Sequence, residues 1–281
     1  GRLAPLAAAF AAMLSITSGA SLAKSLFPAI GAAGTTALRL GIAALILCLV
    51  FRVWRLRPDR RMLPAATPYG LSLGAMNLLF YMAIQRIPLG IALALEFVGP
   101  LGVAILSSRR RADLGWIALA IAGVVLLLPI ETGDHAVDPV GVGLALAAGV
   151  FWGTYIVTGK RAGTVLGAGA PALGMVVGAL LVLPFGIAEA GSGLLDPHIL
   201  GIALAVALLS SAIPYSLEMF ALRRLPAKSF SVVTSGEPAV GAVVGMVALG
   251  EDLPLASWLG IGAVIAASAG TPWSASAARK T

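Results

Sequence analysis

Four charged side chains lie inside otherwise apolar runs of the sequence, and they are the first candidates for chemistry. They are Arg39, Glu96, Glu218 and Glu237. A charge at the centre of a bilayer costs roughly 2.5–3.5 kcal/mol or more, which is tolerated where the group is paired, neutralised or facing a watery cavity. For Glu96 and Glu218 we favour a cavity-facing role. For Arg39 and Glu237 a coupling role and a structural strut between helices both stay open.

Helical spacing places polar and aromatic side chains beside these charges. Ser211, Tyr215 and Glu218 follow one another at intervals of four and three residues and therefore share one helix face. Asn77 and Tyr81, four residues apart, share a face of another helix. We predict that both faces line one substrate-binding pocket.

Aromatic and hydroxyl side chains in two further apolar runs extend this pocket. Trp152 and Tyr155 are predicted to line it, with plain packing or an interfacial belt as the alternative for both. Ser15, Ser18 and Ser21 rank below them, because serines within a span often bond back to their own helix.

Such a pocket has the chemistry to hold a small zwitterion. A carboxylate holds an ammonium group, while Arg39 or an exposed helix N-terminus takes the other end of the molecule. An amino acid is therefore a sensible cargo. Small cationic drugs also suit a pocket of carboxylates and aromatic faces, so the chemistry is permissive rather than specific.

Sequence signatures of soluble enzymes give little support for catalysis. There is no H-E-x-x-H, G-x-G-x-x-G or Walker motif, the one G-x-S-x-G string (residues 70–74, GLSLG) lies inside a predicted span, and neither His135 nor His198 lies in the interior of an apolar run. The single cysteine, Cys48, is expected to be a small core residue rather than a ligand. We therefore expect no catalytic residues, no metal and no cofactor.

The composition is that of an integral membrane protein built from helices. Only 11% of residues are charged, against about 25% in soluble domains, and 59% are hydrophobic. The mean hydropathy is +0.99. Ten apolar runs approach the ~20 residues that span a bilayer, namely 5–23, 32–53, 64–85, 89–108, 114–130, 140–159, 165–188, 198–222, 229–249 and 255–274. The first of them is expected to stay in the membrane rather than to be removed as a signal.

A short string that occurs twice reveals an internal repeat. Residues 83–88 (AIQRIP) return as residues 221–226 (ALRRLP), 138 positions later, and Pro100 matches Pro238 at the same offset. A unit of five spans is odd, so the second copy enters the bilayer from the opposite side. We predict an all-α membrane protein of ten transmembrane helices in two inverted five-helix repeats, residues 1–134 and 135–281, joined by the polar stretch 131–139.

Prolines inside the spans predict where helices break. Pro100, Pro214 and Pro238 each remove a backbone N–H and therefore mark kinks or hinges. Transporters place their binding sites at such broken helices near the middle of the membrane.

Glycines four residues apart predict close helix packing. We interpret these spacings as contacts within one bundle rather than as a dimer interface, which favours a monomer. They occur at Gly70/Gly74, Gly149/Gly153, Gly174/Gly178 and Gly241/Gly245.

The distribution of charge predicts the topology. With the amino terminus placed in the cytoplasm, sixteen of the nineteen Lys and Arg residues fall in inside segments, and seven acids fall outside. Both termini are therefore expected in the cytoplasm. The Lys and Arg residues of these loops account for the net charge of +7. We therefore expect membrane lipid as a partner and do not expect nucleic acid.

Four segments carry a resemblance to a known family. They are 96–104 (EFVGPLGVA), 213–219 (IPYSLEM), 237–239 (EPA) and 249–251 (LGE). The chain resembles, over essentially its whole length, the EamA-type members of the drug/metabolite transporter superfamily, most strongly bacterial inner-membrane exporters of amino acids. One departure is that Gly99 stands where the second repeat has Glu237, which argues against a symmetric site of two carboxylates.

The resemblance implies a multi-pass carrier in the bacterial inner membrane that exports amino acids by alternating access. It also implies a cavity lined by the third, fourth, eighth and ninth helices, with contributions from the first and sixth. Proton coupling through buried carboxylates is a further hypothesis. The alternatives are a multidrug or other metabolite carrier of the same fold, a channel, or a membrane scaffold without transport.

Overall fold

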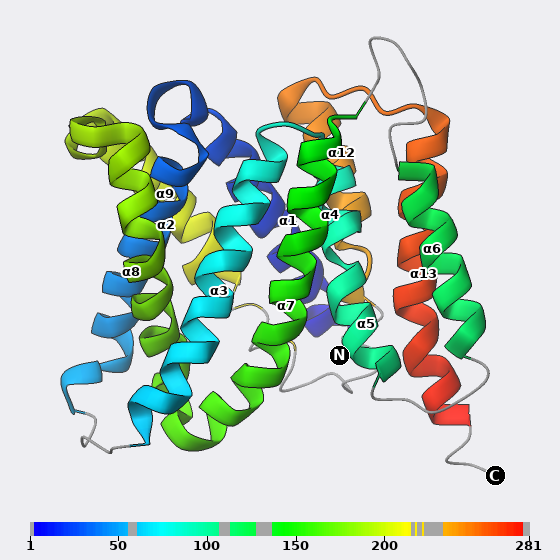
Figure 1. Ribbon diagram of the computed structural model, residues 1–281, viewed down its shortest axis with the longest axis horizontal. Coiled ribbons are helices and arrows are strands. Elements are labelled where there is room, and N and C mark those ends of the chain that lie inside the picture. Colours follow the sequence, from blue (N-terminus) through cyan, green and yellow to red (C-terminus); the bar gives the residue numbers. More distant parts are fainter. Residues whose placement is uncertain are drawn as a thin grey trace.

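The computed structural model describes residues 3–55, 61–106, 113–127, 137–214, 217, 221 and 233–277. Within these ranges the regular structure is helical (Figure 1). The long elements are α1 (Leu3–Lys24), α2 (Phe27–Phe51), α3 (Met62–Ile84), α4 (Leu89–Glu96), α5 (Val98–Leu106), α6 (Asp113–Leu127), α7 (Pro139–Leu166), α8 (Ala170–Ala190), α9 (Pro197–Ala207), α12 (Glu237–Leu249) and α13 (Leu255–Ala277). Short elements are the 3₁₀ helices η1 (Val53–Arg55), η2 (Gly167–Gly169) and η3 (Gly191–Leu195), and the π-helical turn η4 (Leu208–Ala212).

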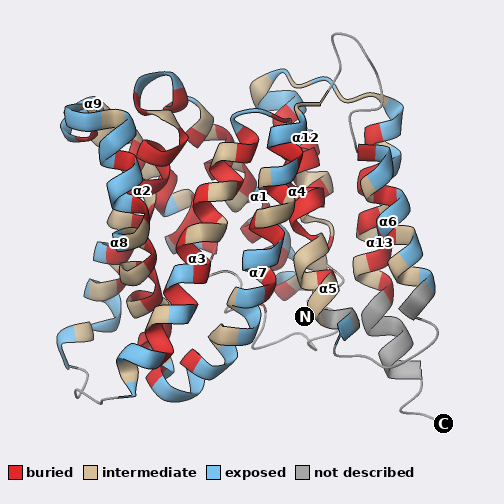
Figure 2. Ribbon diagram, viewed as in Figure 1, coloured by how far each residue is buried: buried red, intermediate tan, exposed pale blue. Residues whose placement is uncertain are grey.

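These helices account for the ten predicted runs, since α4 with α5 occupies the fourth and α9 with η4 the eighth. Among the residues that the structure describes, four helices, in α1, α2, α7 and α8, are long and apolar enough to cross a membrane alone. Large apolar side chains are exposed over the outer surface, for example Leu45 and Val247 (Figure 2). A soluble monomer rarely shows so much exposed apolar surface, whereas lipid covers it in a bilayer. The all-helical membrane fold is confirmed.

Several element boundaries differ from the sequence prediction, and α8 starts at Ala170 rather than at Val165. The sixth run was expected to end at Gly159, but α7 continues through Lys160 and Arg161 to Leu166. Charged residues with long stems extend a helix readily beyond its apolar part. The second run was expected to start at Ala32, but α2 starts at Phe27 and bends at Gly31, whose φ of +67° favours glycine.

The contacts between helices have two-fold symmetry. The packing of α3 on α7 is matched by that of α1 on η4 and α9, and the packing of α4 and α5 on α7 by that of α12 on α1. The helices α2, α4 and α6 each pack on their own counterparts α8, α12 and α13. The first helix of each half, α1 and α7, runs in opposite directions, and α1 begins at the end of the bundle where α13 finishes (Figure 1). This arrangement is that of two inverted halves, while residues 128–136 of the connector lie outside the described residues.

Glycine contacts join the helices of the two halves. A Cβ atom on Gly99 in α5 would lie 1.7 Å from the carbonyl oxygen of Gly149 in α7, and one on Gly74 in α3 would lie 2.7 Å from that of Gly178 in α8. Only residues without a side chain let backbones approach this closely. Glycines of all four predicted pairs thus take part in packing within the bundle.

Acidic side chains cap helix N-termini at the end of the bundle opposite the start of α1. Each carboxylate accepts a backbone N–H and complements the positive end of the helix dipole. The four are Asp138 on α7 (2.8 Å to Val140 N), Asp196 on α9 (2.8 Å to His198 N), Glu189 on α2 (2.6 Å to Ala33 N) and Glu251 on α4 (2.9 Å to Leu89 N). The Val140 N–H and the Arg86 guanidinium together lower the pKa of Asp138. The acids predicted outside therefore hold the fold at this end.

Candidate functional site

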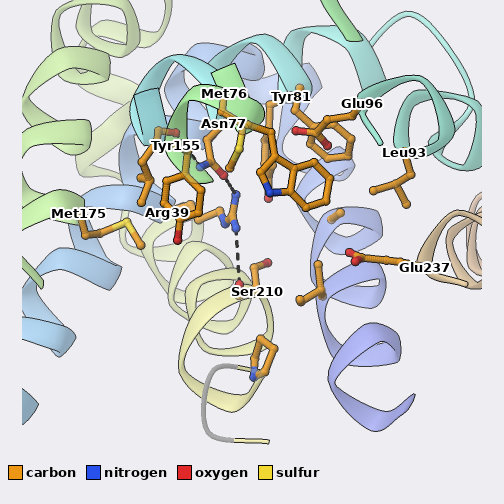
Figure 3. A pocket seen from close by; sticks show the side chains of 16 residues that line it. Arg39, Met76, Asn77, Tyr81, Leu93, Glu96, Tyr155, Met175, Ser210 and Glu237 are labelled. Atoms are coloured by element: carbon orange, nitrogen blue, oxygen red, sulfur yellow. Dashed lines mark hydrogen bonds between the residues drawn. The ribbon is translucent and has the colours of Figure 1, made fainter. Parts of the chain in front are cut away.

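A cavity of about 240 Å³ lies where the two halves meet (Figure 3). Helices α1, α2, α3 and α4 of the first half and α7, α8, η4 and α12 of the second all contribute to it. The lining residues are Ile16, Ala20, Arg39, Leu73, Met76, Asn77, Phe80, Tyr81, Leu93, Glu96, Trp152, Tyr155, Met175, Ser210, Pro214 and Glu237.

Arg39 is the cationic centre of the cavity and is held in place from three sides. Its Nη1 donates to Oδ1 of Asn77, and its Nη2 donates to the carbonyl of Ser210 at 3.5 Å. Its Cζ lies 5.1 Å from the centroid of the Tyr81 ring, a cation–π distance. Asn77 donates its own Nδ2 to the carbonyl of Leu73 at 2.8 Å, which fixes the amide with its oxygen toward Arg39. A planar guanidinium held this way is oriented before any ligand arrives.

Pro214 leaves a backbone carbonyl of its helix free to accept a hydrogen bond from Arg39. A proline cannot donate to the carbonyl four residues earlier, here that of Ser210, and the π-helical turn η4 also leaves the carbonyl of Leu209 open. Arg39 takes the first carbonyl, and the hydroxyl of Ser15 donates to the second at 2.7 Å. The sequence predicted a break at this proline, and its consequence is a polar backbone patch at the cavity.

Two carboxyl groups lie across the cavity from Arg39, as Figure 3 shows for Glu96 and Glu237. Glu96 is the last residue of α4 and only 5% exposed, and the charges of both Glu237 and Arg39 act on it. No hydrogen bond joins its carboxylate to another described residue. Glu237 is the first residue of α12, where a negative charge complements the helix N-terminus.

Aromatic side chains close the remaining wall. The Trp152 ring packs edge-on against Phe97 with centroids 4.8 Å apart. Tyr155 stacks on Tyr69 at 4.9 Å, and their hydroxyls are 3.2 Å apart. The cavity therefore has one cationic side, one anionic side and flat apolar faces between them.

Known proteins that are similar to this chain are membrane transporters. The model of the EamA-like transporter family matches residues 139–271. The threonine/homoserine exporter RhtA of Escherichia coli (strain K12) is 50% identical over 267 residues, covering 95% of this chain and 90% of that protein. This chain belongs to the EamA-like transporter family. RhtA of Salmonella typhimurium (strain LT2) is 51% identical over 95% of the chain and 90% of its own length.

A more distant relative and a solved structure are also similar to this chain. The uncharacterized inner membrane transporter YedA of Escherichia coli (strain K12) is 29% identical over 85% of the chain and 80% of its own length. A solved crystal structure superposes with a TM-score of 0.61 over 96% of both chains. At 20% identity that superposition shows the fold alone.

The structure gathers most of the predicted site of this EamA-family chain. Among the predicted binding, coupling and hinge residues, the ones that line the cavity are Arg39, Asn77, Tyr81, Glu96, Trp152, Tyr155, Pro214 and Glu237. Tyr215 and Glu218 lie outside the described residues. Pro100 and Pro238 lie in α5 and in the first turn of α12 and are not among the lining residues.

Sequence reasoning missed several lining residues. Most are apolar, such as Leu93 and Met175, and nothing distinguishes them in sequence from other core residues. Ser210 is the polar omission, because Ser211 was chosen from helical spacing with Tyr215. Its position four residues before Pro214 is the signal that identifies it, since that proline frees the Ser210 carbonyl.

Proposed function

We propose that this chain is a secondary transporter of the bacterial inner membrane that exports amino acids and related small metabolites by alternating access. One observation carries the proposal, namely that Arg39 and Glu96 face one cavity from opposite sides. Arg39 would bind the carboxylate of an amino acid through paired N–H donors, and Glu96, with Glu237, would bind the ammonium group. The RhtA relatives are threonine/homoserine exporters, which supports this cargo.

Cavity size favours a small metabolite over a drug. Pockets for drug-sized ligands measure about 300–1,000 Å³, and this one measures about 240 Å³. A multidrug carrier of the same fold is the rival function. A drug would have to displace the aromatic wall of Trp152 and Tyr155, whereas an amino acid fits between the charges.

The topology proposed for the chain has both ends in the cytoplasm and the repeats at residues 1–134 and 135–281. The positive-inside distribution of Lys and Arg supports this orientation, and so does the position of α1 and α13 at one end of the bundle. We also propose that the protein acts as a monomer, without catalysis or a cofactor. The glycine contacts within the bundle support the monomer.

Counterflow into liposomes tests the proposed function. Purified protein is reconstituted with unlabelled threonine inside, and uptake of labelled threonine, homoserine and other amino acids is measured against concentration. A carrier gives saturable uptake that needs internal substrate. Uptake that never saturates would indicate a channel, and the absence of uptake for every amino acid tested would contradict amino-acid transport.

A further inference from the structure

Polar atoms without partners remain beside Arg39. The hydroxyls of Tyr81 and Ser210 and the Nε of Arg39 are buried and have no hydrogen-bond partner in the part of the chain that the structure describes, and all three residues line the cavity. Tyr81 is 1% exposed and Ser210 is 5% exposed. Buried hydroxyls in native proteins are nearly always hydrogen-bonded, and one left open indicates a role.

Several other buried hydroxyls in the bundle have partners. Thr17, Thr36 and Ser72 each donate to a carbonyl of their own helix at 2.7–2.9 Å. Tyr155, which also lines the cavity, has the hydroxyl of Tyr69 as its partner. The hydroxyl of Ser211, next to Ser210 in η4, also has no partner in the described part of the chain, but Ser211 is not among the cavity-lining residues.

A glycine on a neighbouring helix leaves room for the Ser210 hydroxyl. Ser210 lies in the π-helical turn η4, a feature that occurs often at functional sites. Its hydroxyl lies against Gly19 of α1, where a Cβ atom would come within 2.4 Å of Ser210 Oγ. Glycine at that position lets the serine keep its hydroxyl at the edge of the cavity (Figure 3).

We propose that the hydroxyls of Tyr81 and Ser210 hydrogen-bond a hydroxyl group on the side chain of the transported amino acid and so determine specificity. The proposal rests on the proposed function, because it takes the amino-acid carboxylate to be on Arg39. Hydroxyls beside that guanidinium reach a substituent close to the α-carbon. Each can donate and accept, which suits a hydroxyl partner and leaves a methyl group without one.

The charges around the cavity disfavour acidic and basic side chains. An acidic side chain would face Glu96 and Glu237, and a basic one would compete with the ammonium group for them while lying near Arg39. A small neutral hydroxylated side chain avoids both repulsions. A site built to hydrogen-bond a substrate hydroxyl strongly rejects the analogue that lacks it, whereas an apolar pocket separates the two only weakly.

Competition between isosteres tests the proposal. Threonine and valine differ by a hydroxyl in place of a methyl, and each is used to inhibit counterflow of labelled threonine. In the wild type, threonine should inhibit at a concentration at least about tenfold lower than valine. In Tyr81→Phe and in Ser210→Ala this ratio should fall by roughly fivefold, through weaker threonine inhibition with valine unchanged.

These variants keep the surroundings of Arg39. Phenylalanine retains the ring beneath the guanidinium, and alanine at position 210 retains the carbonyl that accepts from Nη2. Thr36→Val and Ser72→Ala are the matched controls, because both residues are buried hydroxyls that bond their own helix and do not line the cavity. Both controls should keep the wild-type ratio.

Equal inhibition by threonine and valine in the wild type would overturn the proposal. So would variants in which inhibition by threonine and inhibition by valine weaken to the same degree, since the hydroxyls would then bind the substrate carboxylate or orient Arg39 instead. Homoserine against norvaline in the wild type gives the same comparison if a variant does not reconstitute. Failure of the proposed function is distinct, because then no amino acid shows saturable counterflow.

Discussion

Arg39 is the residue whose position most directly links the fold to the proposed transport. Its guanidinium reaches α3 through Asn77 and η4 through the Ser210 carbonyl, so it joins one helix of each half. A lysine carries the same charge but lacks the planar fork that makes both contacts. A positive charge alone at position 39 is therefore not expected to support the proposed transport.

We expect Arg39→Lys to lower the initial rate of threonine counterflow by at least about tenfold, because the substrate carboxylate loses a pair of oriented donors. The protein should still purify as a folded species by size-exclusion chromatography. Arg86→Lys is the control, since Arg86 is partly exposed and pairs with Asp138 at 3.1 Å at the end of the bundle. Counterflow at the wild-type rate in Arg39→Lys would show that Arg39 is a structural strut only.

Sequence alone identified the charged residues of the site but not every polar partner. Arg39, Glu96 and Glu237 are visible because charges in apolar runs must face a cavity or a partner. Ser210 is not visible in this way, because a serine is common in membrane helices and its exposure to the cavity depends on a π-helical turn. The direction of a side chain in an irregular turn depends on tertiary packing.

At the scale of the helices, the break between α4 and α5 combines a proline with a glycine contact. Pro100 cannot donate to the carbonyl of Glu96, and α4 ends at that residue. Beside the break, Gly99 touches the backbone of Gly149 in α7. The sequence predicted the proline break, but the partner of Gly99 is known only from the three-dimensional packing.

Gly99→Ala should destabilise the protein, because its Cβ atom would lie 1.7 Å from the carbonyl oxygen of Gly149 and the two helices would have to separate. Overpacking typically costs about 1–3 kcal/mol and more where backbone must move. We expect the apparent melting temperature in detergent to fall by roughly 5 °C or more. Gly102→Ala in the same helix is the control, since nothing lies within 4 Å of its Cβ position. Equal stability of the two variants would contradict the tight contact.

At the scale of the whole molecule, three helices are tied together at the end opposite the start of α1. Lys24, the last residue of α1, pairs with Glu251 at 2.6 Å. The second oxygen of Glu251 accepts the Leu89 N–H that begins α4, and Glu251 itself follows α12. An alternating-access carrier must break and remake contacts at each end of its bundle in turn. The Glu251 cluster has the position of such a contact.

Removing this cluster should make the cavity easier to reach from that end. Ala20 lines the cavity in α1, one turn before Lys24, so Ala20→Cys in a Cys48→Ala background reports access to a membrane-impermeant maleimide. With the proposed topology, we expect Glu251→Ala to raise the labelling rate from the periplasmic side of intact cells by roughly threefold or more, because the loss of the ion pair and the cap favours the open state. Asp252→Ala, which leaves both Glu251 contacts in place, should label like the parent. Unchanged labelling in Glu251→Ala would mean that the glycine contacts between helices, rather than the ionic tie, hold this end closed.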